Sequence, residues 1–327
     1  MGESPNCMEL IHKPVLVKET LSFLNPCPGQ VFIDGTVGDG GHAMEILALI
    51  GPAGKLFAFD RDEKSIERSR SRLQQYAGRV EFVHASFAEM GPVLSRLGMN
   101  GRVNGVLLDL GLAWRHYKSN ERGFSYDSDE PLDMRLDRSQ KLTAAEVVNG
   151  WPEDKLIWVF QEYGQENFST YIAAEICRLR RQNMIRSTRQ LTEVVLLAIR
   201  NKLGSSKHTP WVGGLHPATK VFQAIRIAVN DELGHLSRGL SSAIDVLGVG
   251  GRCAVISFHS LEDRIVKNFF RQESRDCLDP PEQPTCTCGH RARVRILTKK
   301  VVSPSSIEQK HNPASRSAKL RVAEKIS

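Results

Sequence analysis

The sequence contains no long hydrophobic run. No segment offers the roughly 18 consecutive apolar residues expected of a transmembrane helix, and residues 1–16 (MGESPNCMELIHKPVL) lack the basic start and apolar stretch of a secretory signal. We therefore expect a soluble protein of the cytoplasm that neither spans a membrane nor is secreted. With 327 residues, 41% of them apolar, the chain can bury a large core.

The cysteines form no regular framework. There are seven, an odd number, and their scattered spacing fits a reducing compartment better than a disulfide scaffold. Cys277, Cys286, Cys288 and His290 could surround a zinc ion, since three thiols and an imidazole suit tetrahedral zinc. Their spacing, C-x8-C-x-C-x-H, differs from the usual paired C-x2-C knuckles. We therefore favour a reduced surface loop and assign no metal.

Positive charge is unevenly distributed along the chain. The net charge is +7, but residues 176–207 carry eight Lys or Arg against Glu193 alone, and residues 291–327 carry ten against Glu308 and Glu324. The remainder is consequently acidic. Two basic segments on an acidic body indicate a polyanionic partner whose phosphates they neutralise. The alternative is a pair of solvated faces.

Residues 31–42 (VFIDGTVGDGGH) are the stretch around which the N-terminal half is organised. A short apolar strand ends at Asp34, four glycines follow, and helical spacing resumes from His42 to Ile50. Such a strand, glycine loop and helix bring backbone N–H groups and a helix N-terminus towards a ligand. The pattern predicts a nucleotide-type pocket, although a tight turn between strand and helix would use the same glycines.

Four strands alternating with helices predict a parallel sheet covered on both faces. The expected strands are Val31–Asp34, Lys55–Asp60, Val80–His84 and Val103–Asp109, and the expected helices are His42–Ile50, Glu63–Tyr76 and Phe87–Leu97. Because Asp34, Asp60 and Asp109 each end a strand, they should line one crevice at the carboxyl edge. Asp60 is placed to accept hydrogen bonds from a ribose diol. Asp109 either orients a reacting group or caps a helix.

The alternation stops after the fourth strand. Residues 114–215 show helical patterns at Ala144–Asn149, Pro152–Tyr163, Asn167–Arg181 and Thr188–Asn201, then a loop at Gly204–Gly214, which predicts an inserted helical subdomain. One long helix from His216 to about Leu247 should lead back to the sheet. A strand at Cys253–Phe258, a helix Leu261–Arg271 capped by Ser260 with Asp263, and late strands at Val294–Val302 and Leu320–Glu324 should complete it.

Nine sequence blocks carry a resemblance to a known family. The chain closely resembles the bacterial 16S ribosomal RNA cytosine-N4 methyltransferases that act on the decoding region, from His12 to Lys325. The blocks are HKPVL (12–16), DGTVGDGGH (34–42), FDRD (59–62), LLDLG (107–111), ERGFS (121–125), PLDMRLD (131–137), HPATKVFQAIRIAVNDEL (216–233), ISFHSLEDRIVK (256–267) and NPASRSAKLRVAE (312–324).

The resemblance implies an α/β fold of the class I S-adenosylmethionine-dependent methyltransferase type: a mostly parallel, doubly wound sheet of about seven strands with an inserted all-helical subdomain. The expected domains are residues 1–112 and 216–327 for the two parts of the methyltransferase domain, and residues 113–215 for the insertion. The implied cofactor is S-adenosyl-L-methionine. The implied partner is 16S ribosomal RNA in the small subunit. A homodimer is a further possibility.

The resemblance also implies a set of site residues. The donor-binding positions fall on Gly40, Gly41 and His42 in the loop, Asp60 at the ribose, Phe87 against the adenine, Asp109, and His116. At the last position the family normally has glutamine within a Ser-Ser-x-Gln run, whereas this chain reads Ala113-Trp114-Arg115-His116. A neutral histidine can still donate one hydrogen bond. Asp109 is the expected catalytic residue.

Several roles stay open at the level of sequence. The ERGFS and PLDMRLD blocks either order a lid or brace the insertion through ion pairs. HSLED (residues 259–263) packs a helix on the sheet, unless His259 faces the crevice. Asn312, Ser315, Arg316 and Ser317 contact RNA or close the pocket. The altered loop also leaves room for a non-catalytic RNA-binding assembly factor, and a nicotinamide oxidoreductase explains the first two acids but neither Asp109 nor the basic segments.

Overall fold

The chain divides into two compact units. The computed structural model describes residues 14–112, 114–118, 121–204, 216–280, 282–283 and 285–327. Unit 1 comprises Met1–Gly111 and Ser237–Ser327, and unit 2 comprises Leu112–Leu236. The first boundary adjoins the one expected at 112. The second lies at Leu236 rather than at 215, because helix α10 (Thr219–Asn230) packs against helices of the insertion.

Unit 1 is built on a seven-stranded sheet in the order β3-β2-β1-β4-β5-β7-β6. The strands are β1 (Val31–Asp34), β2 (Lys55–Asp60), β3 (Val80–His84), β4 (Val103–Asp109), β5 (Leu247–Ser257), β6 (Val294–Ile296) and β7 (Lys319–Lys325). Strands β1 to β5 pair in parallel, and β7 runs antiparallel to both β5 and β6. The mostly parallel sheet of about seven strands is confirmed, with the first four strands at their predicted bounds.

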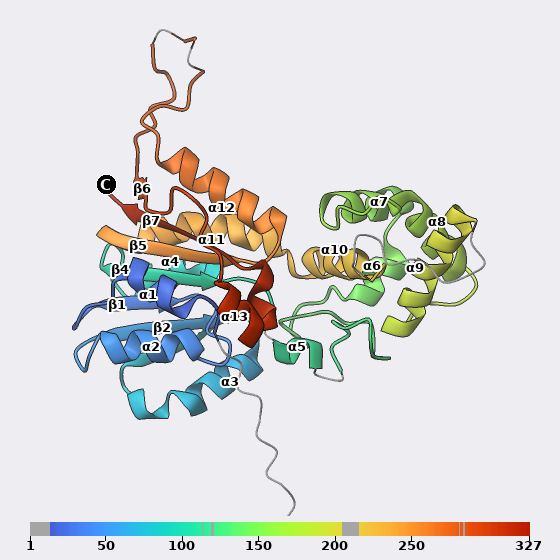
Figure 1. The fold of residues 1–327 in the computed structure, drawn as a ribbon, viewed down its shortest axis with the longest axis horizontal. Helices are drawn as coiled ribbons and strands as arrows, with labels where there is room; N and C mark the ends of the chain where they lie inside the picture. Colours follow the sequence, from blue (N-terminus) through green and yellow to red (C-terminus); the bar gives the residue numbers. More distant parts are fainter. Residues whose placement is uncertain (1–13, 113, 119–120, 205–215, 281, 284) are drawn as a thin grey trace, which may run out of the picture. The chain divides into compact units, whose positions relative to one another are not determined.

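Helices cover both faces of this sheet (Figure 1). Alternate strand side chains, among them Phe32, Leu107 and Ile256, share one core with apolar residues of the first three helices. The residues between them, such as Ile33 and Leu108, are equally buried on the opposite face. The helices of the unit are α1 (Val17–Leu24), α2 (Gly41–Leu49), α3 (Glu63–Arg72), α4 (Met90–Arg96), α11 (Glu232–Val246), α12 (Ser260–Glu273) and α13 (Ser306–His311), with 3₁₀ turns η1 (Gln74–Tyr76), η2 (Phe87–Glu89) and η3 (Pro313–Ser317).

Unit 2 is helical and has its own core, formed by apolar residues from Phe124 to Val229. Its helices are α5 (Trp114–Lys118), α6 (Ala144–Gly150), α7 (Glu153–Glu162), α8 (Ser169–Arg180), α9 (Thr188–Leu203) and α10. Thr143 and Ser187 each cap a helix through a reciprocal capping box. This arrangement provides acceptors for N–H groups that have no partner within the helix. The predicted loop at Gly204–Gly214 lies almost entirely outside the described residues.

The single long helix predicted from His216 to Leu247 is wrong. Two helices replace it, and Asp231 between them has a left-handed backbone with φ of 47°. The side chain of Asn230, which is fully buried, donates to the carbonyl oxygen of Met134 at 2.7 Å. Neither residue is a glycine or a proline, so the sequence carries no ordinary break signal here.

The return to the sheet also differs from prediction. Strand β5 begins at Leu247 rather than at Cys253, and its pairing with β4 shifts register between Val103 and Gly105. Helix α12 is capped by His259 with Glu262 rather than by Ser260 with Asp263. The Asp263 carboxylate is instead paired with Arg321 of β7 at 2.7 Å. Within the described residues, no helix is long and apolar enough to cross a membrane.

Candidate functional site

The loop after β1 is attached to the ends of its two neighbouring strands. The Gly35 amide donates to the Leu107 carbonyl of β4 at 2.8 Å, and the Val37 amide donates to the Phe59 carbonyl of β2 at 2.9 Å. The amide of Gly38, whose φ is 52°, donates to Asp60 Oδ2 at 2.9 Å. The loop is therefore held at the carboxyl edge of the sheet, where a ligand of an open α/β sheet binds.

Asp109 at the end of β4 is held through its backbone. Its amide donates to Thr36 Oγ1 at 2.6 Å, so a hydroxyl in the glycine loop fixes the end of the neighbouring strand. Its Oδ2 lies 3.6 Å from His42 Nε2, in the first turn of α2. Sequence reasoning missed Thr36, because a threonine beside the glycines gives no signal of its bond to a residue so distant in the chain.

Asp34, Asp60 and Asp109 form an acid group at this edge. Asp34 is its buried member. Burial raises its pKa to about 7; the positive charge of His42 acts in the opposite sense, and the negative charges of Asp109 and Asp60 add to the rise. Burial disfavours a charged His42, but the carboxylates of Asp109 and Asp34 outweigh it and raise the pKa of the imidazole. The three predicted acids thus interact with one another, and His42 lies among them.

Asp60 is oriented by two backbone amides at the end of β2. One carboxylate oxygen accepts from Gly38 and the other from the Asp62 amide, both at 2.9 Å. These bonds fix the carboxylate beside the glycine loop. Its role at a ribose stays a prediction.

Gly40 and Gly41 form the start of α2. Gly40 has φ of 77°, a conformation that favours glycine, and a Cβ at Gly41 would lie 3.0 Å from the Pro14 ring. Most loop amides donate within the protein, contrary to the expectation that the loop exposes them. The first N–H groups of an α-helix have no partner within the helix, and Gly41 and His42 occupy the first two positions of α2.

Phe87 begins the 3₁₀ turn η2 beyond β3. Ser86 and Glu89 close this turn with a capping box. A Cβ at Gly35 would lie 2.9 Å from Phe87 Cβ, and one at Gly239 of α11 would lie 2.3 Å from the phenyl ring. Phe87 therefore packs closely against two glycines, with its Cβ on Gly35 and its ring on Gly239. After Thr36, Gly239 is a second residue that no sequence pattern indicated.

His116 belongs to unit 2 and is described there by itself. Its side chain is buried, and its ring meets Phe124 edge to face with centroids 5.9 Å apart. Ala113 of the altered loop, and His12 and Lys13 of the first block, lie outside the described residues. Six of the seven predicted donor residues lie in unit 1, and the roles of all seven stay predictions.

The ERGFS and PLDMRLD blocks brace unit 2. The buried Glu130 carboxylate accepts from the amides of Arg122 and Gly123 at 3.1 and 2.8 Å. Asp133 pairs with Arg135 through two bonds of 2.8 Å, which lowers the pKa of Asp133 although its burial alone would raise it. These contacts support the bracing role proposed from sequence.

Both basic segments are partly neutralised by acids. In unit 2, Arg178 pairs with Glu175 at 2.6 Å. In unit 1, Arg295 pairs with Glu324 at 2.6 Å, and Arg321 pairs with Asp263. The sequence-level charge therefore overstates the basic character of the tail, whose β7 is an inner strand of the sheet rather than a free arm.

The cluster of cysteines differs from the set of possible zinc ligands considered from the sequence. Cys277, Cys286 and Cys288 come together with Asp279 rather than with His290. The Nδ1 atom of His290 lies instead 2.8 Å from the carbonyl oxygen of Arg275.

Comparison with known proteins gives one consistent result. Residues 9–326 match the MraW methylase family. The ribosomal RNA small subunit methyltransferase H of Symbiobacterium thermophilum is 47% identical over 98% of this chain and 98% of its own length. The protein of the same name from Heliobacterium mobile is 44% identical over 98% of this chain and its full length.

Among solved structures, a putative rRNA methylase from Clostridium thermocellum aligns over 96% of this chain and 97% of its own, with a TM-score of 0.44 and 13% identity. That likeness is too distant to add to the argument. The family match covers nearly the whole chain and confirms the resemblance expected from the nine blocks, and with the observed strand order it confirms the class I methyltransferase fold. The chain belongs to the MraW methylase family.

Proposed function

We propose that this protein transfers the methyl group of S-adenosyl-L-methionine to the exocyclic N4 of a cytidine in the decoding region of 16S ribosomal RNA. The observation that carries the proposal is the acid-lined glycine loop of unit 1, in a chain 47% identical to a ribosomal RNA small subunit methyltransferase H. The relevant compartment is the cytoplasm, where the small subunit is assembled.

The residues at the carboxyl edge fit the donor. S-adenosylmethionine supplies a methyl group activated by a cationic sulfur. The Asp60 carboxylate, held beside the loop, would accept hydrogen bonds from its ribose, and the Phe87 ring would lie against its adenine. The Asp109 carboxylate at the same edge would favour the sulfur cation over the neutral thioether left after transfer.

Asp109 is the group that we assign to the acceptor. The N4 amine of cytidine is a weak nucleophile because its lone pair is conjugated with the ring. A carboxylate that accepts an N4–H hydrogen bond aligns the amine and stabilises the positive charge that develops on nitrogen. The Thr36 hydroxyl fixes the Asp109 backbone, so the carboxylate is positioned before the base arrives.

The target base must leave its stack to reach this edge. Sequence-specific recognition of RNA mostly uses single-stranded or distorted segments whose bases can be extruded. Basic residues outside the ion pairs described above would hold the RNA backbone through its phosphates.

The test is the replacement Asp60→Asn with the full-length chain. An amide keeps one acceptor oxygen for the loop but has lost the charge that strengthens bonds to the ribose. We expect about 10- to 100-fold weaker binding of S-adenosylmethionine in calorimetry, in line with loss of one or two charge-assisted hydrogen bonds. Glu67→Gln, an exposed change on α3, is the matched control and should bind as the parent does.

Methyl transfer is measured separately on small subunits from cells that lack the protein. Mass mapping should show one new methyl group on a cytosine amine. Unchanged donor binding in Asp60→Asn would contradict the assignment of Asp60 to the donor site. Donor binding without methylation of RNA or small subunits would contradict the activity and favour an assembly factor.

A further inference from the structure

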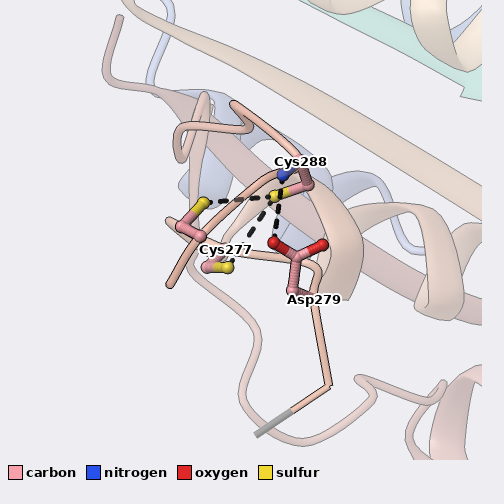
Figure 2. Close-up of side chains that lie close together, drawn as sticks. Cys277, Asp279 and Cys288 are labelled. Atoms are coloured by element: carbon pink, nitrogen blue, oxygen red, sulfur yellow. Dashed lines mark hydrogen bonds between the residues drawn. The ribbon is translucent and has the colours of Figure 1, made fainter. Parts of the chain in front are cut away.

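Three exposed cysteines lie together in the segment between α12 and β6. Free cysteine is ordinarily among the most buried residue types, so three exposed thiols in one short segment need an explanation. The Sγ atom of Cys288 lies 3.7 Å from that of Cys277 and 3.7 Å from that of Cys286. Figure 2 shows Cys277, Asp279 and Cys288 directed towards one another.

A carboxylate completes the group. Ligand atoms of the three cysteines and of Asp279 all lie within 4.8 Å of one another. One Asp279 oxygen accepts from the amides of Thr287 and Cys288 at 2.6 and 3.0 Å, which fixes the carboxylate beside the thiols. Its acceptor capacity exceeds these bonds, as for any carboxylate.

The spacing suits a tetrahedral metal. Thiolates bind zinc at about 2.3 Å, and two such sulfurs at tetrahedral angles lie about 3.8 Å apart. The two measured sulfur separations are 3.7 Å. A disulfide requires about 2.05 Å between sulfurs, so these cysteines are not bonded to one another, and their separations match those of two thiolates on one tetrahedral ion.

Backbone amides support a thiolate at the centre of the group. The Leu278 and His290 amides donate to Cys288 Sγ at 3.3 and 3.4 Å. Gly289, with φ of 64°, lets the chain turn so that the His290 amide points back at the sulfur. Both amides would stabilise a thiolate at Cys288, and metal binding needs the deprotonated form.

We propose that Cys277, Asp279, Cys286 and Cys288 form a structural zinc site that fastens the segment between α12 and β6. The proposal does not depend on the methyltransferase reaction, because the site uses neither the acid group nor the glycine loop. His290 is outside the ligand set, since its ring bonds the Arg275 carbonyl and its Nε2 lies 3.9 Å from Glu273.

The test is metal content of the full-length protein. Protein purified in reducing buffer without chelator should contain about one zinc per chain, and cobalt substituted for zinc should give sulfur-to-metal charge-transfer absorption. Cys286→Ser and Cys288→Ser should lose the metal and the absorption. Two controls should retain both: Cys27→Ser, which removes an exposed thiol elsewhere, and His290→Ala.

A second measurement guards against variants that fail to fold. Chelation of the unmodified protein should speed tryptic cleavage at the exposed Arg275 and Arg291 without changing cleavage elsewhere. Zinc well below one per chain in reduced protein, equal zinc in Cys286→Ser, or a disulfide among these cysteines by intact mass would each overturn the proposal.

Discussion

At the scale of single residues, the acid group is the part of the site that the sequence predicted best. An apolar run that ends in aspartate indicates the carboxyl end of a strand, and parallel strands bring such ends to one edge. Asp34, Asp60 and Asp109 follow this rule. Thr36 and Gly239 could not be predicted, since each acts through a contact with an element distant in the sequence.

The buried Asp34 should make stability depend on pH. Its pKa is about 7 in the folded protein and 3.8 when unfolded, so the folded state keeps a proton that the unfolded state has released. Stability therefore falls as pH rises from about 4 through 7. The raised pKa of His42 acts in the same direction above pH 6.5.

Asp34→Asn removes the first of these contributions. The free energy of unfolding of the variant, relative to the parent, should rise by about 2.5 kcal/mol between pH 5 and pH 8, and its melting temperature should rise with it. Thermal unfolding across that range measures the difference. Glu81→Gln, an exposed change on β3, should show no such trend. A constant difference for Asp34→Asn would mean that the group titrates normally.

At the scale of helices and strands, the boundaries that were predicted wrongly share one cause. Periodicity placed β1 to β4 and most helices, because their burial follows a local pattern. The break at Asp231 and the early start of β5 were missed, since both depend on tertiary partners: Asn230 bonds Met134, and Leu247 at the start of β5 pairs with Val103 of β4. His259 was likewise not expected at the N-cap of α12, where its amide donates to the Glu262 carboxylate at 3.3 Å.

The packing of α11 against η2 leads to a prediction at this scale. Gly239→Ala favours the helix by propensity, but the new methyl would lie 2.3 Å from the Phe87 ring and must displace it. We expect about tenfold weaker binding of S-adenosylmethionine, roughly 1.4 kcal/mol, by calorimetry.

The matched control is Gly91→Ala on α4. Its methyl would meet Ser242 Oγ at 3.4 Å, an ordinary contact, so donor binding should be unchanged and stability should rise by about 0.5–1 kcal/mol. Equal donor affinity in Gly239→Ala and Gly91→Ala would show that Phe87 does not contact the adenine.

At the scale of the whole molecule, only basic residues without an acidic partner add to the positive charge that RNA would meet. Lys299, Lys300 and Arg316 are exposed and have no ion-pair partner among the described residues of the chain. Arg316 precedes β7, whose start pairs with the end of β5, so it lies at the carboxyl edge with the acid group. These three residues are our candidates for phosphate contact within unit 1.

Replacing all three by glutamine should weaken RNA binding most at low salt. Each lost phosphate contact should reduce the slope of log affinity against log salt by about 0.7–0.9. Filter binding with small-subunit RNA over a salt series gives the slope. The triple replacement Lys55→Gln, Arg96→Gln and Arg102→Gln, near the opposite edge, should leave it unchanged, and equal slopes for the two triples would rule out this face.

Insertion of unit 2 between β4 and β5 has a consequence for folding kinetics. These two strands are hydrogen-bonded neighbours, yet all of Leu112–Leu236 separates them in the chain. Closing so long a loop carries an entropic penalty, which a helical segment with its own core reduces by collapsing first. Changes that loosen the core of unit 2 should therefore slow the refolding of the sheet, even when they leave every strand residue intact.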